Sequence, residues 1–472
     1  MMRYRIYGDR RASPEKKRPE MTWRDHLAML LHIGAEIEHS LMVQYLYAAY
    51  SLGGEQVPPE HRAMVSRWQA HILAVAKEEM GHLLTVQNVL TLIGAPINLD
   101  RQDLPWDAPF YPFPFQLERL TLDSLACYVY AEMPAEGHTA IADGKHPRAA
   151  FLQRITKRAT RRIVGVPHRV GELYDEIIGL IGDTDRIHES LFLEHTYASQ
   201  AATDDWGRGY QPDPRLVDAG GTLVKPSGKQ AGPSPEAHVM IDRVATRRQA
   251  IDALTALSLQ GEAPEFLDGN NELSHFDRFF EIYEQLEKFE GADWQPSRPV
   301  AVNPTTLKDA DHPHHGGYIS AKHSREWASL FNLRYRMLLR YLAHTFRLAR
   351  VTRPDSPNLR AMVMHRVFGE MYNLKTLAGI LVRLPLRDGH KGELAGPPFE
   401  MPYTLHLPAS ELEVWSSHSD LVGSSQRICM TLLKSGAGER DYLAALLDLD
   451  HQARSWIDGI VKGLRPTERP AA

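Results

Sequence analysis

The sequence AKEEMGHLLTVQNVLTLI, residues 76–93, gives the first evidence of the fold. Its Glu79 and His82 stand three residues apart, so on a helix both side chains lie on one face and can reach the same ion. The neighbours of Glu79 on that face are all apolar: Ile72, Val75, Ala76, Leu83, Val86, Leu90 and Ile93. A carboxylate in an apolar stripe points into a helix bundle, whereas a surface glutamate lies on the polar face. Glu78 lies on the more polar side, and we expect it beside a metal site or in solvent.

A second Glu-x-x-His pair, Glu272 with His275, occurs downstream. Two such pairs on separate helices, with one glutamate from each of two further helices, are the ligand set of ferritin-like di-iron or di-manganese bundles. One pair arises by chance in any charged helix, but two on helices of suitable length form a specific signal. Pro264, which lies between two glycines, interrupts the approach to the second pair and places it near a helix start.

The first helix, expected over residues 23–50 behind a Thr22 cap, supplies the next carboxylate. Glu36 forms a Glu-x-x-His of its own with His39, but the apolar stripe passes through Glu38. The other members of that stripe are Leu31, Ala35, Leu41, Met42, Tyr45 and Ala49. Glu38 is therefore the expected ligand. Tyr45, seven residues further, falls on the same face, where it could bond a ligand or donate an electron; an ordinary core tyrosine is the other interpretation.

Helical periodicity extends over the whole chain, and no alternating run is long enough to predict a strand, so the fold class is all-α. Further helices are expected over residues 59–93, 123–131, 167–181, 239–259, 271–290, 325–348, 358–382, 410–434 and 439–462. Residues 100–115, rich in proline and aromatic rings, form a loop packed by its own rings. The chain divides into a mobile basic tail (1–21), a di-metal bundle with long inserted loops (22–293), a linker (294–317), a second helical unit (318–464) and a short tail (465–472).

Composition excludes several function classes. Lysine and arginine number 54 against 59 acidic residues, and this net charge of -5 gives no reason to bind nucleic acid. No apolar run approaches the roughly 20 residues of a membrane span. The two cysteines, Cys127 and Cys429, lie outside any C-x-x-C spacing, so we expect neither a disulfide framework nor a thiolate zinc site, and a cytoplasmic location fits.

Four blocks carry a resemblance to a known family: AEIEHSLMVQYLYAAYSL (35–52), AKEEMGHLLTVQNVLTLIGAP (76–96), VGELYDEI (170–177) and NELSHFDRFFEI (271–282). They resemble successive parts of the ferritin-like domain of the iminophenyl-pyruvate dimer synthase family, and AGPPFE (395–400) is also similar. That family includes enzymes that couple two tryptophan-derived imines on the way to violacein and related bisindoles. Its named synthases are far longer, so this chain resembles a short, stand-alone form.

The resemblance implies a ligand set for two iron ions, with manganese as the alternative: Glu38, Glu79, His82, Glu172, Glu272 and His275. For Glu172 the helix pattern does not support a ligand role, because the apolar stripe of its helix lies on the opposite side. Glu176 on the same helix is the alternative ligand. Glu132, just after an apolar helix, belongs to another block similar to the family. It either lines the substrate cavity or packs at the helix end.

Mixed histidine and carboxylate ligands suit iron or manganese, so we expect a non-haem di-iron oxidoreductase that activates dioxygen or peroxide. By resemblance, its substrate is a small amino-acid-derived imine, enamine or 2-oxo acid of secondary metabolism, and a homo-oligomer is compatible with this interpretation. The alternative is a ferritin-like iron-binding or peroxide-detoxifying protein without organic substrate. Length favours the enzyme, because a detoxifying bundle needs only four helices and this chain adds a second helical unit.

Overall fold

The computed structural model describes residues 20–107, 111–134, 144, 148–162, 170–206, 238–261, 274–308, 317–348, 358–389, 392–401, 405–436 and 438–465. Over these residues the protein is helical and contains no strand, only isolated bridges, which confirms the all-α prediction. The α-helices are α1 (Trp23–Ser51), α2 (Arg62–Leu92), α3 (Leu122–Ala131), α5 (Ala149–Ala159), α6 (Val170–Gly182), α7 (Arg247–Gly261), α8 (His275–Glu287), α9 (Lys322–Thr345), α10 (Leu359–Leu381), α11 (Glu411–Lys434) and α12 (Arg440–Leu464). Short 3-10 helices lie at Pro59–His61, Thr160–Arg162, Glu189–Leu191, Glu194–Ser199 and Thr203–Trp206.

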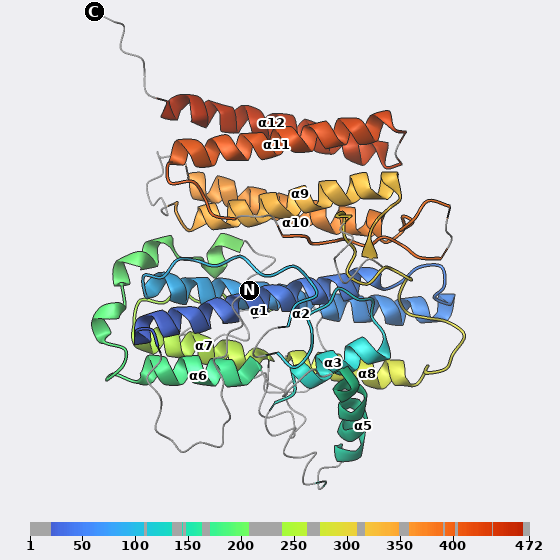
Figure 1. Ribbon diagram of the computed structural model, residues 1–472, viewed down its shortest axis with the longest axis horizontal. Coiled ribbons are helices and arrows are strands. Elements are labelled where there is room, and N and C mark those ends of the chain that lie inside the picture. The colour runs from blue at the N-terminus through green and yellow to red at the C-terminus, as the bar shows by residue number, and fades with distance from the viewer. Residues whose placement is uncertain are drawn as a thin grey trace, which may run out of the picture.

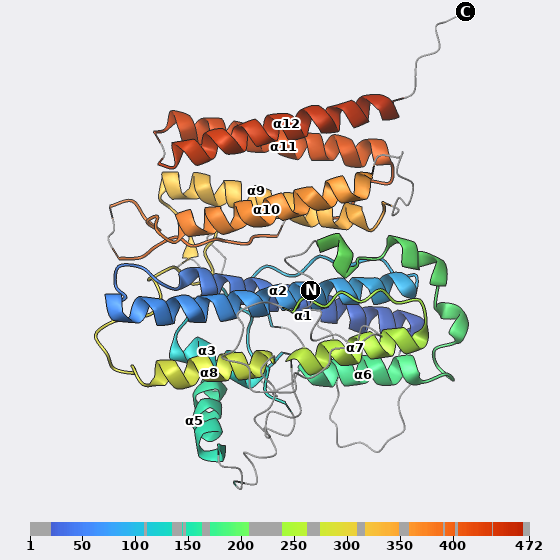
Figure 2. The ribbon, with the colours of Figure 1, turned by 180° about the vertical axis from the view of Figure 1, so that it is seen from behind.

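The helices form a stack of layers (Figure 1). α11 and α12 make one outer layer, α9 and α10 the next, and the long pair α1 and α2 follows. The last layer contains α3, α6, α7 and α8, from which α5 projects; the view from behind shows the same order (Figure 2). No described helix has both the length and the apolar character needed to cross a membrane.

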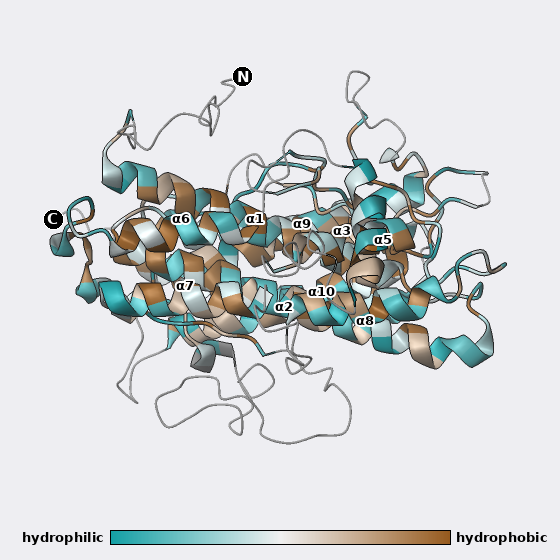
Figure 3. Ribbon diagram, turned by 90° about the horizontal axis from the view of Figure 1, so that it is seen from below, coloured by the Kyte–Doolittle hydropathy of each residue, from teal (hydrophilic) through white to brown (hydrophobic). Residues whose placement is uncertain are grey.

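The last layer consists of two interrupted rows. Seen from below, α6 and α3 lie end to end in one row, and α7 and α8 lie end to end in the other (Figure 3). α6 packs on α7 and α3 packs on α8, while α1 and α2 cover both rows. The N-terminal bundle therefore has two long, unbroken helices, and each of its other two positions is filled by a pair of shorter helices. Both interruptions lie over the middle of α1 and α2.

Local chemistry explains most helix boundaries. The Thr22 side chain accepts a hydrogen bond from the backbone N–H of Asp25, as expected for the cap of α1. α2 ends before Gly94, whose φ of 66° is in the left-handed region that glycine tolerates. The loop after α2 is packed by its rings, as predicted: Tyr111 stacks on Phe115 with centroids 4.0 Å apart.

Two helix predictions are wrong at their start. The helix predicted over residues 271–290 begins only at His275, because Ser274 is an extended N-cap whose side chain accepts from Asp277 N–H, so Glu272 precedes that helix. Residues 239–259 are predicted as one helix, but α7 begins only at Arg247, and the segment before it is extended along α2. Side chains from elsewhere bind its backbone: Asp242 N–H donates to Thr85, and Val244 N–H donates to Gln200. The carbonyl of Met240 also lies so close to α2 that a Cβ at Gly81 would approach it to 2.5 Å. Tertiary hydrogen bonds therefore replace the helical ones in this segment.

A buried ion network holds the C-terminal helices α9 to α12 together. Arg334 of α9 donates to Glu370 of α10 at 2.9 Å, to Ser425 of α11 at 2.7 Å and to Asp450 of α12 at 2.5 Å. All four side chains are buried. Burial opposes the charged form of Glu370 and raises its pKa, although Arg334 acts in the opposite direction. The guanidinium is thus the shared partner of one side chain from each of the other helices.

The division of the chain at residues 293 and 317 stays a prediction.

We predict that Arg334→Met destabilises the protein by about 3–5 kcal/mol, because removing one partner leaves buried carboxylates uncompensated. The measurement is the guanidinium midpoint of unfolding, followed by circular dichroism. The control is Arg383→Ala, which removes the partner of Glu439 in a pair whose side chains are 58% and 46% exposed; a surface pair contributes only about 0–1 kcal/mol. Equal shifts for the two variants would show that the network is not a major source of stability.

Candidate metal centre

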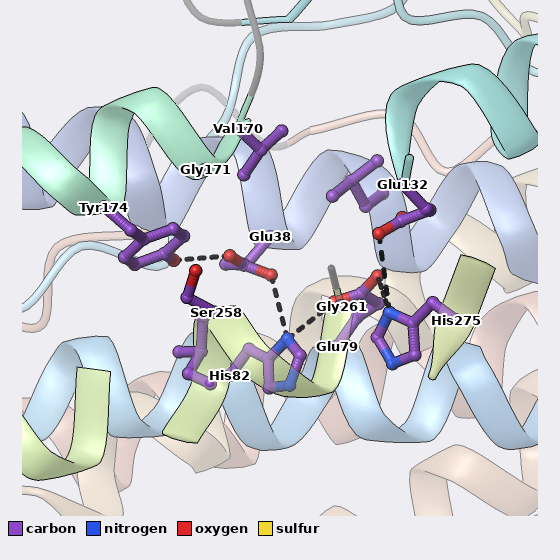
Figure 4. Close-up of a pocket in the computed structure, with 12 residues that line it drawn as sticks. Glu38, Glu79, His82, Glu132, Val170, Gly171, Tyr174, Ser258, Gly261 and His275 are labelled. Carbon is purple, nitrogen blue, oxygen red and sulfur yellow. Dashed lines mark hydrogen bonds and ion pairs between the residues drawn. The ribbon is translucent and has the colours of Figure 1, made fainter. Parts of the chain in front are cut away.

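A small cavity lies where the two interrupted rows meet α1 and α2 (Figure 4). Its lining comes from six elements: Glu38 and Leu41 of α1, Glu79 and His82 of α2, Glu132 just after α3, Val170, Gly171 and Tyr174 at the start of α6, Leu257, Ser258 and Gly261 at the end of α7, and His275 at the start of α8. The helix ends of the last layer thus converge on the middle of the two long helices. This arrangement lets residues at helix ends face the cavity.

Glu79 lies between the two histidines. Its Oε2 is 2.9 Å from Nδ1 of His82, and its Oε1 is 3.2 Å from Nδ1 of His275. The two imidazole rings are stacked, with centroids 5.3 Å apart. Ligand atoms of the three residues all lie within 4.8 Å of one another. A carboxylate that presents one oxygen to each of two imidazoles has the geometry of a bridging ligand.

Each histidine also faces a second carboxylate that a tyrosine holds in place. At one end, Glu38 Oε2 is 3.5 Å from His82 Nδ1, and the Tyr174 hydroxyl donates to Glu38 Oε1. At the other end, Glu132 Oε2 is 3.8 Å from His275 Nδ1, and the Tyr45 hydroxyl donates to Glu132 Oε1 at 2.5 Å. The site therefore has two similar halves: Glu38, His82 and Tyr174 form one, and Glu132, His275 and Tyr45 form the other. Glu79 belongs to both.

Hydrogen bonds on the far side of each ring fix its orientation. His82 Nε2 lies 2.9 Å from Gln260 Oε1, and His275 Nε2 lies 3.1 Å from Glu78 Oε2. Glu78 also accepts from Arg278, so it belongs to the surroundings of the site and not to solvent. A proton on each Nε2 leaves Nδ1 as the nitrogen that faces the cavity, which is how outer partners set the tautomer of a ligating histidine.

The pKa values of the site are coupled through its charges. Burial opposes an imidazolium at His82, but hydrogen bonds to Glu38 and Glu79 outweigh it and raise the pKa of His82 to about 10. The pKa of His275 is raised as well, again against desolvation, by Glu79, Glu132 and Glu78. Desolvation raises the pKa of Glu38 to about 7, whereas the two histidines lower that of Glu79 despite its burial.

Three donor atoms make no well-directed hydrogen bond to any described residue, although each lies 3.2 to 3.5 Å from an ionisable neighbour: Glu38 Oε2, Glu79 Oε1 and His275 Nδ1. All three are buried and belong to side chains that line the cavity. Buried polar atoms normally have well-formed hydrogen bonds, so three without them on one cavity fit a bound ion. Carboxylate oxygen and imidazole nitrogen together are the donor set of iron, manganese or zinc, so these residues fit a metal pair.

The cavity contains many of the predicted site residues. Glu38, Glu79, His82 and His275 meet there, and Tyr45 reaches it through Glu132. Glu172 is partly buried on α6 between lining residues but does not line the cavity itself. Glu176 lies 3.6 Å from His26. Glu272 lies outside the described residues.

Glu132 lines the cavity, whereas Glu172, the glutamate implied by the resemblance, does not. Helical periodicity could not find Glu132, because it follows the last residue of α3 and its direction is set by Tyr45, 87 residues away. The one signal was the block that resembles the synthase family. Of the two expectations for Glu132, the structure places it on the cavity. The ligand roles of all these residues stay predictions.

The chain is similar to known proteins over much of its length. The ferritin-like family model matches residues 31–284, more than half of the chain. Dichlorochromopyrrolate synthase from Lentzea aerocolonigenes is 28% identical over 419 residues, which cover 80% of this chain and 36% of that protein. The chain thus spans about a third of the length of this relative. A ferritin-like protein from Caulobacter vibrioides, known from its crystal structure, is 14% identical and covers 75% of this chain and 96% of its own, with a TM-score of 0.39.

We predict that Glu38→Ala strips the protein of metal and that Glu36→Ala leaves metal content nearly unchanged. Glu38 lines the cavity, whereas Glu36 Oε1 accepts a hydrogen bond from Asn98 outside it. The measurement is metal per chain by mass spectrometry after reconstitution with ferrous iron. If the two variants behaved in reverse, the helix phase assigned to α1 would be wrong.

Metal binding at this site is expected to release protons. Below a pKa of about 10, His82 is protonated in the metal-free protein, and the raised pKa of His275 acts in the same sense. A metal ion can bind Nδ1 of His82 and Nδ1 of His275 only when each of these atoms has lost its proton. Metal binding at pH 7 should therefore release about two protons or more, and the affinity for the metal should rise with pH. Calorimetric titration with Mn²⁺ in buffers of different ionisation enthalpy measures that number. Heats independent of the buffer would contradict this protonation state.

Proposed function

The chain belongs to the ferritin-like family, and from that membership we propose that it is a non-haem di-iron oxidative enzyme acting on a small amino-acid-derived compound. The observation that carries the proposal is the paired geometry of the cavity. One carboxylate, Glu79, faces both imidazoles, and each imidazole has a further carboxylate held by a tyrosine. A two-ion site of this kind requires such a duplicated donor set.

Bound iron would supply the electrons that reduce dioxygen or peroxide. The residues of the chain hold the ligands and exclude water. Tyr174 and Tyr45 each occupy one oxygen of a carboxylate, which leaves the other oxygen to face the cavity. Burial raises the pKa of Tyr45 well above its ordinary value, so its hydroxyl keeps a proton next to Glu132. That hydroxyl and the hydroxyl of Tyr174 on Glu38 are the phenolic groups that can give a proton or an electron to the reaction.

The substrate class rests on two observations. The synthase from Lentzea aerocolonigenes is named for a chromopyrrolate product, and 80% of this chain aligns with it. The cavity walls beside the donors are apolar or small, including Leu41, Val170 and Leu257, as is usual for sites that take small organic ligands. We therefore propose an aromatic imine, enamine or 2-oxo acid as substrate.

We also propose a reducing, cytoplasmic location. Cys127 and Cys429 are both buried and free, as thiols are in a reducing compartment.

The test is iron-dependent turnover. Protein reconstituted anaerobically with ferrous iron should hold close to two ions per chain. Its consumption of dioxygen or peroxide should rise about tenfold or more when the imine of an aromatic 2-oxo acid is added. Metal analysis and an oxygen electrode provide both measurements. Full metal content with consumption that no aromatic imine or amino acid stimulates would favour the iron-handling alternative, and trace metal only would contradict the di-iron site.

Tyr45→Phe serves as a matched variant in the same experiment. It removes one hydroxyl from a ring that packs between Tyr128 and Phe279, so the fold and iron content should persist. Turnover should fall by about 100-fold if the hydroxyl takes part in proton transfer. Unchanged turnover would mean that Tyr45 is an ordinary core tyrosine.

A further inference from the structure

The helix α7 presents a face without ligands to the cavity. Its three lining residues, Leu257, Ser258 and Gly261, carry neither carboxylate nor imidazole, whereas α1, α2, α8 and the residue after α3 all supply one. Gln260 of the same helix points elsewhere and binds His82 from its far side. Among the described residues, α7 is therefore, together with α6, a side of the cavity that supplies neither carboxylate nor imidazole.

Gly261 lies directly over one half of the site. A Cβ built at this position would lie 3.4 Å from Glu132 Oε2 and 3.9 Å from His275 Nδ1, two atoms that are 3.8 Å apart. A methyl group there would cover the gap between the two donor atoms. Both contacts would be ordinary van der Waals contacts, so nothing would have to move to admit it.

Backbone conformation does not explain this glycine. Its φ lies outside the left-handed region that disfavours other residues, so alanine can adopt the same conformation. Among the described residues, the space above Glu132 and His275 is what a side chain at position 261 would fill. Next to that space, His275 Nδ1 and Glu79 Oε1 make no well-directed hydrogen bond to a described residue.

We propose that Gly261 is a specificity-determining residue: it keeps the Glu132–His275 half of the centre open on the α7 side to a small exogenous ligand of the size of dioxygen, peroxide or azide. This inference rests on the proposed metal centre and adds to it the direction from which the small ligand enters. A side chain at position 261 fills that space without touching the far side of either histidine, so the ligands themselves stay in place.

The test compares Gly261→Ala with Gly179→Ala after both are loaded with iron. Gly179 is an exposed glycine within α6 whose added Cβ would meet no atom within 4 Å, so it is a matched helical control. Iron per chain is measured first, together with the thermal midpoint of unfolding. Azide is then titrated into the oxidised protein, and the azide-to-iron absorption band gives the dissociation constant. Gly261→Ala should keep the iron content of the wild type and bind azide about tenfold more weakly or worse, while Gly179→Ala matches the wild type in both.

Each other outcome is decisive. Azide affinity equal to the wild type at full iron content would overturn the role of Gly261 and leave the proposed di-iron function standing. Loss of iron from Gly261→Ala alone would also overturn it, because the glycine would then serve ion binding and not ligand access. Failure of the wild type to take up iron would be seen before any azide is added, and would reject the proposed function itself.

Discussion

Burying a cluster of charges inside an apolar bundle is the constraint on which the rest of the structure depends. Four carboxylates are buried at the centre of the N-terminal bundle: Glu38, Glu78, Glu79 and Glu132. An ionised carboxylate removed from water costs several kcal/mol unless other charges and hydrogen bonds compensate it. The cationic groups that contact them are Arg278 and the two imidazoles, whose pKa values are raised. Among the described residues, three positive groups therefore face four buried carboxylates, and desolvation raises the pKa of one of these, Glu38, to about 7.

This constraint explains why two bundle positions are filled by interrupted helices. Donor groups must come from several directions, and the ends of α3, α6, α7 and α8 bring residues to the cavity that the middle of an unbroken helix would direct elsewhere. The two unbroken helices, α1 and α2, supply the remaining donor groups, and their other side packs against the C-terminal helices. There α9 covers α1, and the hydroxyl of Tyr335 hydrogen-bonds to buried His39, one residue after Glu38. The C-terminal bundle thus contacts the helix that carries a candidate ligand.

The sequence was informative where a ligand lies within a long amphipathic helix. Glu38 and Glu79 were found because a carboxylate in an apolar stripe breaks the pattern of a bundle helix, and both line the cavity. Glu132 and the start of α7 depend instead on partners distant in sequence: Tyr45 for the carboxylate, and Thr85 and Gln200 for the extended segment before α7. The spacing of apolar residues within one helix cannot predict contacts between residues that are distant in sequence. For Glu172 the stripe of its helix already pointed away, and the residue does not line the cavity.

The two halves of the site are similar in their donors but differ in their surroundings. Behind His82 stands the neutral amide of Gln260, whereas behind His275 stands Glu78, a carboxylate paired with Arg278. A carboxylate at the far nitrogen makes an imidazole a stronger donor than an amide does. Each half has a tyrosine hydroxyl on its carboxylate, so the hydroxyls do not distinguish them. The half with the stronger imidazole is, however, also the half over which Gly261 leaves space. Donor strength and space for a small ligand therefore coincide at the Glu132–His275 half, which distinguishes it from the Glu38–His82 half within one shared cavity.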